Sequence, residues 1–236
     1  MSTGQTIGIV ACSSEGAALC YRTICTRGPV SLGPHRHPEI LLHSSPLRQY
    51  VDALESGDLP AVAELMLASA QILAAAGADF LICPDNTIHA AMDLVRPASP
   101  LPWLHIAEIV AAEARRSDVR KVAILGTKWL VESDVYPGAL DVVGIDYMLP
   151  EPQEREEMGR IIMEELVNDV QLQDSVRYFV DLIERMRDRG CDAAILGCTE
   201  IPLIISDDNS PLTAFDSTRL LADAALRFAV TSEATR

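Results

Sequence analysis

The chain has 236 residues, of which 49% are hydrophobic and 22% charged, a composition typical of globular proteins with a substantial core. Its formal net charge of −15, from 19 basic and 34 acidic residues, argues against a nucleic-acid-binding protein, which needs clustered lysine and arginine. No apolar run approaches the ~20 residues that span a bilayer, and the first residues do not resemble a secretory signal, so we expect a cytoplasmic protein without a membrane partner.

Strands and helices are predicted to alternate in the first half of the chain. Short apolar runs that end in small or polar residues are typical of buried parallel strands, whereas longer stretches that begin with a capping residue or a proline predict helices. The predicted strands cover residues 7–11, 39–43, 80–83 and 103–106. The predicted helices cover residues 15–26, 59–76 and 88–94, and residues 97–102 form a predicted turn.

The second half of the chain repeats this alternation. Its predicted strands cover residues 122–125, 146–149, 193–196 and 212–215. Its predicted helices cover residues 107–116, 129–140, 154–189 with an interruption near 168–173, and 218–230. The alternation predicts an α/β fold of parallel sheets with helices on both faces, in which ligands bind at the carboxyl ends of the strands.

Two segments of the chain resemble each other without a gap. Residues 77–87 and 190–200 each contain a Gly/Asp turn, a short apolar run and a polar triplet. In this alignment Asp85 lies opposite Cys198. Because each segment reads as a buried strand with a polar carboxyl end, we expect an acid and a thiol to face one cleft.

An earlier pair of segments, residues 6–12 and 121–127, shows the same kind of similarity. We therefore predict an internal duplication, with two similar Rossmann-like or flavodoxin-like lobes related by a pseudo-twofold axis and an active site in the cleft between them. The last predicted strand and helix have no evident counterpart, so we assign them to the first lobe. The predicted first lobe is 1–105 plus 211–236, and the second is 106–210.

The cysteines do not follow the pattern of a metal site. They lie at positions 12, 20, 25, 83, 191 and 198, with no CxxC pair and no paired zinc spacing. We interpret His35, His37 and His43 as solvated surface residues rather than metal ligands. The sequence therefore predicts no bound metal.

Two motifs carry a resemblance to a known family. Residues 197–203, Gly-Cys-Thr-Glu-Ile-Pro-Leu, and residues 85–89, Asp-Asn-Thr-Ile-His, resemble the aspartate/glutamate racemase superfamily. This group works without a cofactor and also contains hydantoin racemases, maleate isomerases and arylmalonate decarboxylases. Shorter matches extend the resemblance over nearly the whole chain, at residues 7–9, 104–107, 125–127 and 215–218.

The resemblance implies a small-molecule carboxylate or amino-acid substrate, no cofactor, and a reaction with two acid/base groups. In the family, two thiols flank the α-carbon of the substrate. The second matches Cys198, whereas Asp85 replaces the first, which usually precedes Asn-Thr. One group removes the α-proton, the other reprotonates the opposite face, and hydrogen-bond donors hold the developing charge. The expected substrate-binding residues are Ser13, Ser14, Arg48, Asn86, Thr87, Thr127 and Thr199.

Roles are expected for three further side chains, of which that of Arg48 alone rests on the resemblance. Arg48 stands where some aspartate-specific members place an arginine for the distal carboxylate, which favours an acidic amino acid; a surface ion pair is the alternative. Glu200 is expected to bond the loop backbone and fix the turn at Cys198. His89 is expected either to orient the substrate or a neighbour, or to serve as a helix-capping or core residue. The family resemblance makes a homodimer the expected assembly.

The proposed pair is chemically unequal. Reference pKa values of about 3.9 for aspartic acid and about 8.5 for cysteine predict a carboxylate and a thiol at rest. The reverse proton distribution costs roughly 6 kcal/mol before the site perturbs either group. Burial of Asp85 and donors near Cys198 would reduce this gap. A helix cap is the alternative role for Asp85, and Cys83 is a candidate substitute thiol.

Three functions stay open at this point. The first is a cofactor-independent racemase or epimerase that uses Asp85 and Cys198. The second is a decarboxylase or isomerase of the same superfamily that needs only one thiol, with Cys198 protonating an enolate. The third is a protein that binds a small carboxylate without catalysis.

Overall fold

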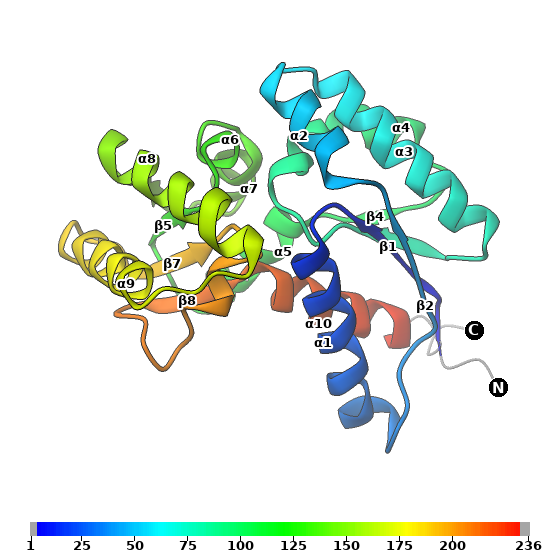
Figure 1. Ribbon diagram of the computed structural model, residues 1–236. Helices are drawn as coiled ribbons and strands as arrows, with labels where there is room; N and C mark the ends of the chain where they lie inside the picture. The colour runs from blue at the N-terminus through cyan, green and yellow to red at the C-terminus, as the bar shows by residue number, and fades with distance from the viewer. Residues whose placement is uncertain (1–3, 232–236) are drawn as a thin grey trace. The chain divides into compact units, whose positions relative to one another are not determined.

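The structure is a computed structural model in which residues 4–231 are described (Figure 1). These residues contain two four-stranded sheets in which all neighbouring strands are parallel. The first sheet has the order β2 (Ile40–Ser44), β1 (Ile7–Ala11), β3 (Phe80–Ile82), β4 (Trp103–Leu104). The second has the order β6 (Asp146–Met148), β5 (Lys121–Leu125), β7 (Ala193–Leu196), β8 (Thr213–Asp216). The predicted α/β fold with two similar parallel sheets is confirmed.

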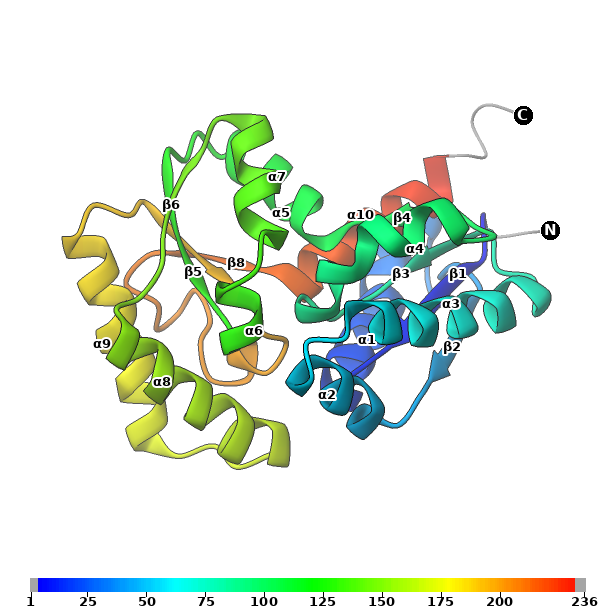
Figure 2. The same ribbon diagram turned by 90° about the horizontal axis from the view of Figure 1, so that it is seen from above.

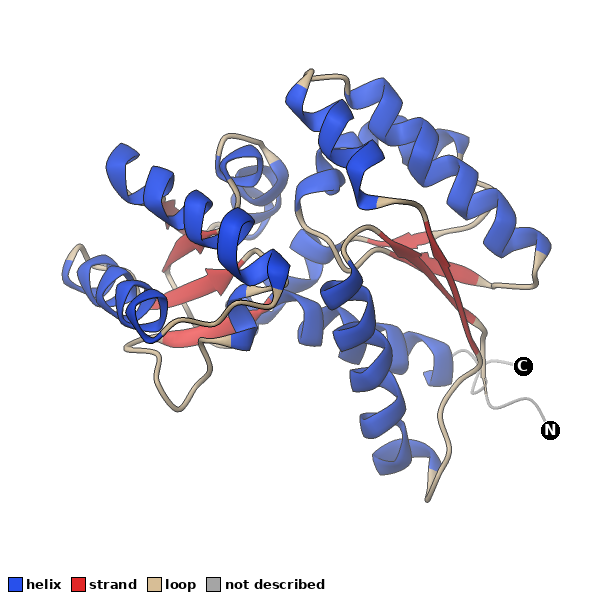
Figure 3. Cartoon of the chain, in the orientation of Figure 1, coloured by secondary structure: helices blue, strands red, loops and turns tan. Residues whose placement is uncertain are grey.

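Helices connect the strands throughout the described chain (Figure 3). Up to β4 they are α1 (Ser14–Leu32), α2 (Leu47–Glu55), α3 (Leu59–Ala75), the 3₁₀ segment η1 (Thr87–Ala91) and α4 (Met92–Ala98). Next come α5 (Ile106–Arg116), α6 (Lys128–Val131), α7 (Val135–Val143) and α8 (Pro152–Arg160). The rest are η2 (Ile161–Glu165), η3 (Leu166–Asn168), α9 (Gln173–Asp188), η4 (Ile201–Leu203) and α10 (Ser217–Thr231). No helix within residues 4–231 is both long and apolar enough for a membrane span.

Each sheet is covered by helices on both faces. Figure 1 shows α3 on one face of the first sheet and α1 with α10 on the other. Figure 2 shows α8 and α9 on one side of the second sheet and α7 on the other. Because both faces are covered, every residue of β1 and β7 is buried, which explains the uninterrupted apolar runs in these strands.

The two sheets have the same hydrogen-bond register. Ile7 pairs with Phe80 in the first sheet, as Val122 pairs with Ala193 in the second. The copies are therefore offset by 115 residues at β1 and β5 and by 113 residues at β3 and β7. These are the offsets of the sequence repeat, so the repeat corresponds to a real equivalence of strands.

The sequence offset between the copies can be continued beyond the paired residues. With the offset of 113 residues, Asp85 and Cys198 occupy equivalent positions after β3 and β7. β4 lies beside β3 as β8 lies beside β7, with an offset of 111 residues. The helices that follow, α5 and α10, consequently begin at equivalent residues, Ile106 and Ser217.

The chain divides into two compact units. The first extends to Ile106 and resumes at Thr218, and the second is Ala107–Ser217. β8 pairs with β7 and lies in the second unit, which corrects the expectation that residues 211–217 complete the first lobe. The sequence repeat missed this because β4, the counterpart of β8, has only two residues and too little sequence for a recognisable pattern.

Several helical segments differ from the predicted spans. α1 continues past residue 26 to Leu32, and α4 extends to Ala98, inside the predicted turn 97–102. The helix α2 was not predicted, because it has only nine residues and buries only Tyr50 and Ala53. The predicted helix 129–140 is broken into α6 and α7. At the break, the Ser133 hydroxyl donates to the Leu130 carbonyl at 2.7 Å, an alternative to continued helix.

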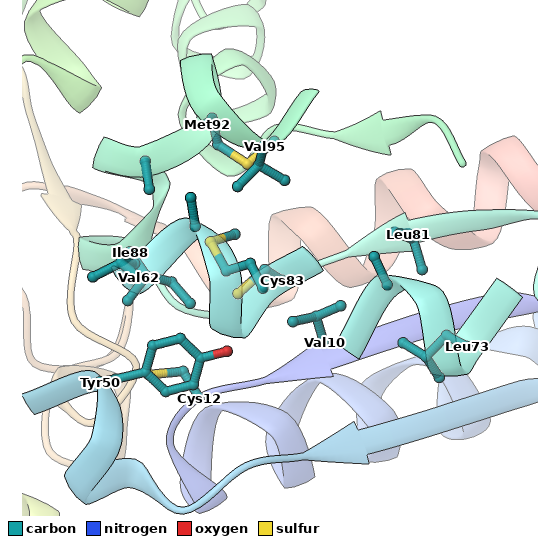
Figure 4. Packing of buried hydrophobic residues seen from close by; sticks show 14 of the residues in the cluster. Val10, Cys12, Tyr50, Val62, Leu73, Leu81, Cys83, Ile88, Met92 and Val95 are labelled. Carbon is teal, nitrogen blue, oxygen red and sulfur yellow. The ribbon is translucent and has the colours of Figure 1, made fainter. Parts of the chain in front are cut away.

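The core of the first unit reaches the ends of its strands. It combines strand residues such as Val10 with the α3 residue Met66 and with Tyr50 of α2. Figure 4 shows the Tyr50 ring beside Cys12, with the hydroxyl directed toward the interior of the cluster. Cys12 and Cys83, which follow β1 and β3, belong to the same cluster. The loops that carry polar residues therefore start from well-packed positions.

Candidate active site

Polar residues gather at the carboxyl ends of the strands in each unit. In the first unit, Ser13 follows β1 and Asp85 follows β3. In the second unit, Thr127 follows β5 and Cys198 follows β7. Each pair lies on neighbouring strands of one sheet.

Asp85 lies in the loop between β3 and η1. Its Oδ1 accepts a hydrogen bond from the Ile88 backbone N–H at 3.1 Å. The side chain is half-buried, and the following residues Asn86 and Thr87 are buried. Asp85 therefore caps the start of η1, which was the alternative to a chemical role, and it makes this bond with one of its two carboxylate oxygens.

His89 holds the backbone of the same loop. Its Nδ1 lies 2.6 Å from the Asp85 carbonyl oxygen, and its Nε2 lies 3.4 Å from the Ile106 backbone nitrogen. A carbonyl can only accept and a backbone N–H can only donate, so Nδ1 carries the proton and Nε2 is the acceptor. The structure thus places His89 between the Asp85 loop and the start of α5.

Cys83 precedes Asp85 by two residues and is fully buried. Burial raises the pKa of the Cys83 thiol well above its usual range, and the negative charge of Asp85 raises it further. A hydrogen bond from the Asp85 backbone opposes these effects only in part. Because the thiolate is the reactive form of cysteine, so firmly protonated a thiol is a poor proton acceptor. Cys83 therefore fits a core position better than that of a substitute base.

Tyr50 is a buried polar residue near this strand end that the sequence analysis missed. Burial raises the pKa of its phenol above the usual range, and the charges of Cys83 and Cys12 add to that effect. Interaction with the Ser69 hydroxyl lowers the pKa but does not reverse the shift. The spacing of Tyr50 and Ala53, three residues apart, was the available signal for one buried helix face.

The two serines after β1 differ in burial. The Ser13 Oγ accepts a hydrogen bond from the Gly16 N–H at 3.2 Å and so caps α1. A hydroxyl that accepts such a bond still has one proton to donate. Ser14, the first residue of α1, is exposed, whereas Ser13 is buried.

Arg48 lies on the surface of α2. Its side chain is 71% exposed and pairs with Asp52. A second acid, Glu55, lies 3.7 Å from the same guanidinium group. This is the surface ion-pair arrangement that was the alternative for Arg48, so a role in binding a distal carboxylate would require it to leave these partners.

Two glycines allow the ends of β5 and β7 to approach closely. A Cβ at Gly197 would lie 2.8 Å from the Leu125 carbonyl oxygen and 2.6 Å from the Leu130 side chain. A Cβ at Gly126 would lie 3.2 Å from the Gly197 carbonyl oxygen. The Gly197 N–H also donates to the Leu125 carbonyl at 2.7 Å. The backbone geometry that leads into Cys198 therefore requires glycine.

Cys198 makes a contact that the sequence analysis did not anticipate. Its thiol donates a hydrogen bond to Oε2 of Glu200 across 2.9 Å, and the Thr199 hydroxyl donates to the same oxygen at 2.9 Å. Glu200 is only 3% exposed. A buried carboxylate needs such hydrogen bonds. The expectation that Glu200 bonds the loop backbone is therefore corrected, because its carboxylate bonds two side chains.

Other side chains support the second strand end. The Thr127 Oγ1 accepts from the Leu130 N–H at 3.3 Å and caps α6. The Ser217 hydroxyl donates to the Leu196 carbonyl at 2.8 Å and thereby ties the end of β7 to the start of α10. Burial raises the pKa of Tyr136, which also hydrogen-bonds Ser217.

The predicted residues thus form two groups, one in each unit. Asp85, Asn86, Thr87 and His89 share one loop of the first unit. Cys198, Thr199 and Glu200 share one loop of the second. Within residues 4–231, no three histidine, cysteine, aspartate or glutamate side chains converge as metal ligands would.

A family model and solved structures match this chain along most of its length. The model of the Asp/Glu/Hydantoin racemase family matches residues 9–225. A putative Asp/Glu racemase from Yersinia pestis is 30% identical with a TM-score of 0.87, over 96% of this chain and 99% of that one. An aspartate racemase homologue from Pyrococcus horikoshii OT3 is 27% identical with a TM-score of 0.82, over 95% of this chain and 99% of that one.

Curated relatives match over shorter spans. A glutamate racemase from Koribacter versatilis (strain Ellin345) is 32% identical over 151 residues, which are 61% of this chain and 49% of that protein. The match therefore spans about half the length of that relative. The broad specificity amino-acid racemase RacX of Bacillus subtilis (strain 168) is 23% identical over 186 residues, 79% of each chain. Because the family model covers nearly the whole sequence, the chain belongs to the Asp/Glu/Hydantoin racemase family.

Proposed function

We propose that the protein is a cofactor-independent racemase or epimerase of a small carboxylate, with an acidic amino acid as the first substrate to test. Asp85 and Cys198 act as the two acid/base groups at the α-carbon. The reaction class is supported by relatives named glutamate racemase and broad specificity amino-acid racemase.

The observation that carries this proposal is the equivalence of the two strand ends. The sheet register assigns Asp85 and Cys198 the same position after β3 and β7. Each is a group that can exchange a proton, and the Cys198 thiol is already engaged in a hydrogen bond to Glu200. In this proposal a reaction that needs two acid/base groups takes one from each repeat.

The reaction consists of two proton transfers. The Asp85 carboxylate removes the α-proton from one face, and the electrons of the C–H bond move into the neighbouring carboxylate of the substrate. The Cys198 thiol then delivers its proton to the opposite face and becomes a thiolate. In the reverse direction the thiolate removes the proton and the protonated Asp85 returns its own.

Hydrogen-bond donors complete the site in this proposal. The hydroxyls of Ser13 and Thr127, together with Ser14, Asn86 and Thr87, hold the substrate carboxylate and its developing negative charge. Thr199 would join them only if its hydroxyl leaves Glu200, to which it donates. Preorganised donors of this kind are worth most when they do not have to reorient during the reaction. Capping bonds at Ser13 and Thr127 provide such fixed positions.

A one-thiol decarboxylase or isomerase is the second candidate. It is favoured by the bond between the Asp85 Oδ1 and the Ile88 N–H, because a capping carboxylate has a structural reason to be present. In that reaction a malonate-like substrate loses carbon dioxide, and Cys198 protonates the resulting enolate. Asp85 then needs no proton transfer.

The substrate side chain and the assembly are also part of the proposal. An acidic side chain would be held by Arg48 if the guanidinium leaves Asp52, with which it pairs. A panel of acidic and neutral amino acids tests this specificity. We propose a homodimer in the cytoplasm; sedimentation of the purified protein tests the dimer, and fractionation of the source cells tests the location.

The decisive experiment follows hydrogen exchange at the substrate carbon. The protein is incubated in heavy water with L- and D-amino acids and with substituted malonates, and deuteration at Cα, optical rotation and carbon dioxide are measured. Racemisation predicts deuteration with loss of optical activity, and unequal bases predict unequal deuteration from the two hands. Release of carbon dioxide would instead favour the second candidate.

Variants of the two groups test the mechanism in the same assay. Cys198→Ala and Asp85→Ala should each lower turnover by about 10²- to 10⁴-fold, the usual contribution of a general acid or base. Cys25→Ala, on α1 away from the strand ends, is the matched control and should keep wild-type turnover. Turnover at the wild-type rate in both active-site variants would refute the mechanism.

A further inference from the structure

The side chain of His89 connects two parts of the first unit that are distant in sequence. It bonds the Asp85 carbonyl at 2.6 Å through Nδ1, and it accepts from the Ile106 N–H, 17 residues away, at 3.4 Å through Nε2. Ile106 is the first residue of α5, and the first N–H groups of a helix have no partner within the helix. One imidazole therefore satisfies both a loop carbonyl and a helix N-terminus.

The surroundings of His89 fix its chemical form. The residue is only 2% exposed, and the His105 ring packs against it edge-on with 4.6 Å between ring centroids. Only the neutral form with the proton on Nδ1 makes both backbone bonds. Burial, with the nearby charge of Arg96, lowers the pKa of His105 to about 4, so this neighbour is neutral at pH 7 as well.

The second unit makes the corresponding connection with a different group. Ser217, the equivalent of Ile106, donates its hydroxyl directly to the Leu196 carbonyl at 2.8 Å. Ile106 has no hydroxyl, and its backbone N–H is linked to the strand end through His89. In both sheets the first residue of the helix after the fourth strand is therefore hydrogen-bonded to the third strand or to the loop that follows it. The first sheet uses the His89 imidazole for this link and the second uses the Ser217 hydroxyl.

We propose that His89 is a positioning residue that couples the backbone of Asp85 to the start of α5, the helix in which the chain passes from the first unit to the second. The inference rests on the proposed function, because the position of Asp85 affects turnover only if Asp85 exchanges the substrate proton. While both bonds are made, the backbone of Asp85 and that of Ile106 keep one relative position.

Two conservative variants separate the two bonds. In His89→Asn the amide nitrogen replaces Nδ1, so the bond to the Asp85 carbonyl can stay while the Ile106 N–H loses its acceptor. In His89→Gln the longer side chain brings an amide oxygen near the position of Nε2, so Ile106 keeps an acceptor while the Asp85 carbonyl loses its donor. The control is His37→Asn, at an exposed imidazole with Nδ1 only 2.8 Å from the Pro38 carbonyl.

The kinetic test compares deuterium exchange from the two hands of the substrate. Both His89 variants should lower kcat for the hand that Asp85 deprotonates by roughly 10- to 100-fold, the effect expected of a ~1 Å misplacement, with a smaller change in KM. Exchange from the hand that Cys198 deprotonates should fall less. Wild-type kcat in His89→Asn would overturn the proposal, because the bond to α5 would then not matter.

A test without substrate separates this inference from the proposed function. Nitrogen NMR of the wild-type protein should show His89 as the neutral form protonated at Nδ1. Hydrogen exchange of the Ile106 amide should be slow in the wild type and in His89→Gln, and faster in His89→Asn. A different tautomer in the wild type, or slow exchange in all three proteins, would overturn the coupling whether or not a racemase activity is found.

Discussion

The two equivalent strand ends contain the same kinds of group in different arrangements. After β3, the thiol of Cys83 is buried in the core, and Asp85, two residues later, accepts a backbone hydrogen bond. After β7, the thiol of Cys198 and the carboxylate of Glu200, also two residues later, bond each other. The two thiols are not at equivalent positions, because the counterpart of Cys198 is Asp85 and that of Cys83 is Leu196. The comparison teaches that the same two kinds of group differ in their contacts according to where they stand after the strand. Local hydrogen bonding decides which group is available to exchange a proton.

The contacts that support Asp85 and Cys198 also differ between the two units. In the first unit the Asp85 carboxylate accepts a hydrogen bond from the backbone N–H of Ile88. In the second unit the thiol lies against the carboxylate of Glu200, so a thiolate at Cys198 would meet a like charge. The scaffold is duplicated, but we expect the two ends to respond differently to the same type of substitution.

The largest effect is expected from Asp85→Asn, which separates the two roles of the first strand end. Asparagine caps a helix about as well as aspartate, so the free energy of unfolding should change by less than ~0.5 kcal/mol. The amide cannot act as a base, so turnover should fall by about 10²- to 10⁴-fold. Urea unfolding and the heavy-water assay measure the two quantities on the same preparation.

Asp85→Ala is the matched comparison for this prediction, because it removes both roles. It should lose the same turnover and also about 1 kcal/mol of stability, the usual cost of a lost cap. If Asp85→Asn keeps wild-type turnover, Asp85 is only a cap. The two strand ends would then differ in function as well as in chemistry.

Glu200→Gln tests the contact that distinguishes the second strand end. Without the carboxylate the Cys198 thiol loses its charged acceptor, and we expect turnover to fall by about 100-fold, toward the low end for acid/base groups. Removal of the negative charge should also favour the thiolate, so alkylation of Cys198 at neutral pH should become faster. Peptide-level mass spectrometry distinguishes Cys198 from the other five cysteines.

The exposed Glu156→Gln on α8 is the control for this substitution, and it should leave both rates unchanged. Slower alkylation in Glu200→Gln would contradict the assigned contact, because it would mean that the carboxylate promotes thiolate formation.

The sequence predicted the fold and the strand ends that carry the candidate residues, because both depend on local patterns. Apolar runs flanked by glycine and polar residues located β1, β3, β5 and β7, and the ungapped repeat correctly aligned Asp85 with Cys198. The sequence pattern did not predict features that depend on contacts between residues far apart in the chain. β8 joins the second sheet through pairing with β7, and nothing in residues 211–217 specifies that partner.

The contacts of the candidate residues were harder to predict than the strands that carry them. The hydrogen bond between Cys198 and Glu200 depends on how a buried side chain turns, which spacing alone does not determine. The surface ion pair of Arg48 depends on α2, a short helix whose signal was limited to the spacing of Tyr50 and Ala53. The link from His89 to Ile106 joins residues 17 apart and needed the sheet to be assembled.

Gly197→Ala tests whether the tight backbone at the second strand end can be loosened. The new Cβ would lie 2.8 Å from the Leu125 carbonyl oxygen, a backbone atom that cannot move alone. We expect a loss of about 1–3 kcal/mol in the free energy of unfolding, the usual cost of overpacking. Gly159→Ala on α8 meets no atom within 4 Å and should be neutral or slightly stabilising. Equal stability of the two variants would show that the turn is not tight.

The smallest predicted effect concerns His105. Its equivalent in the second unit is Asp216, so of the two units only the first has an imidazole at this position. The pKa of His105 is about 4 in the folded protein and about 6.5 in an unfolded chain. As pH falls, the unfolded chain binds the proton first, so stability is lost between pH 6.5 and 4.

From pH 7 to pH 5.5 this loss amounts to about 1 kcal/mol in the free energy of unfolding. His105→Phe cannot bind the proton, so its stability should fall by about that much less over the same interval. Urea titrations at the two pH values measure the difference, and His37→Phe, at an exposed histidine, should keep the wild-type slope. An unchanged slope in His105→Phe would mean that the first unit does not bury a neutral imidazole beside His89. The segments that contain His105 and Asp216 would then respond to pH more similarly than these two residues suggest.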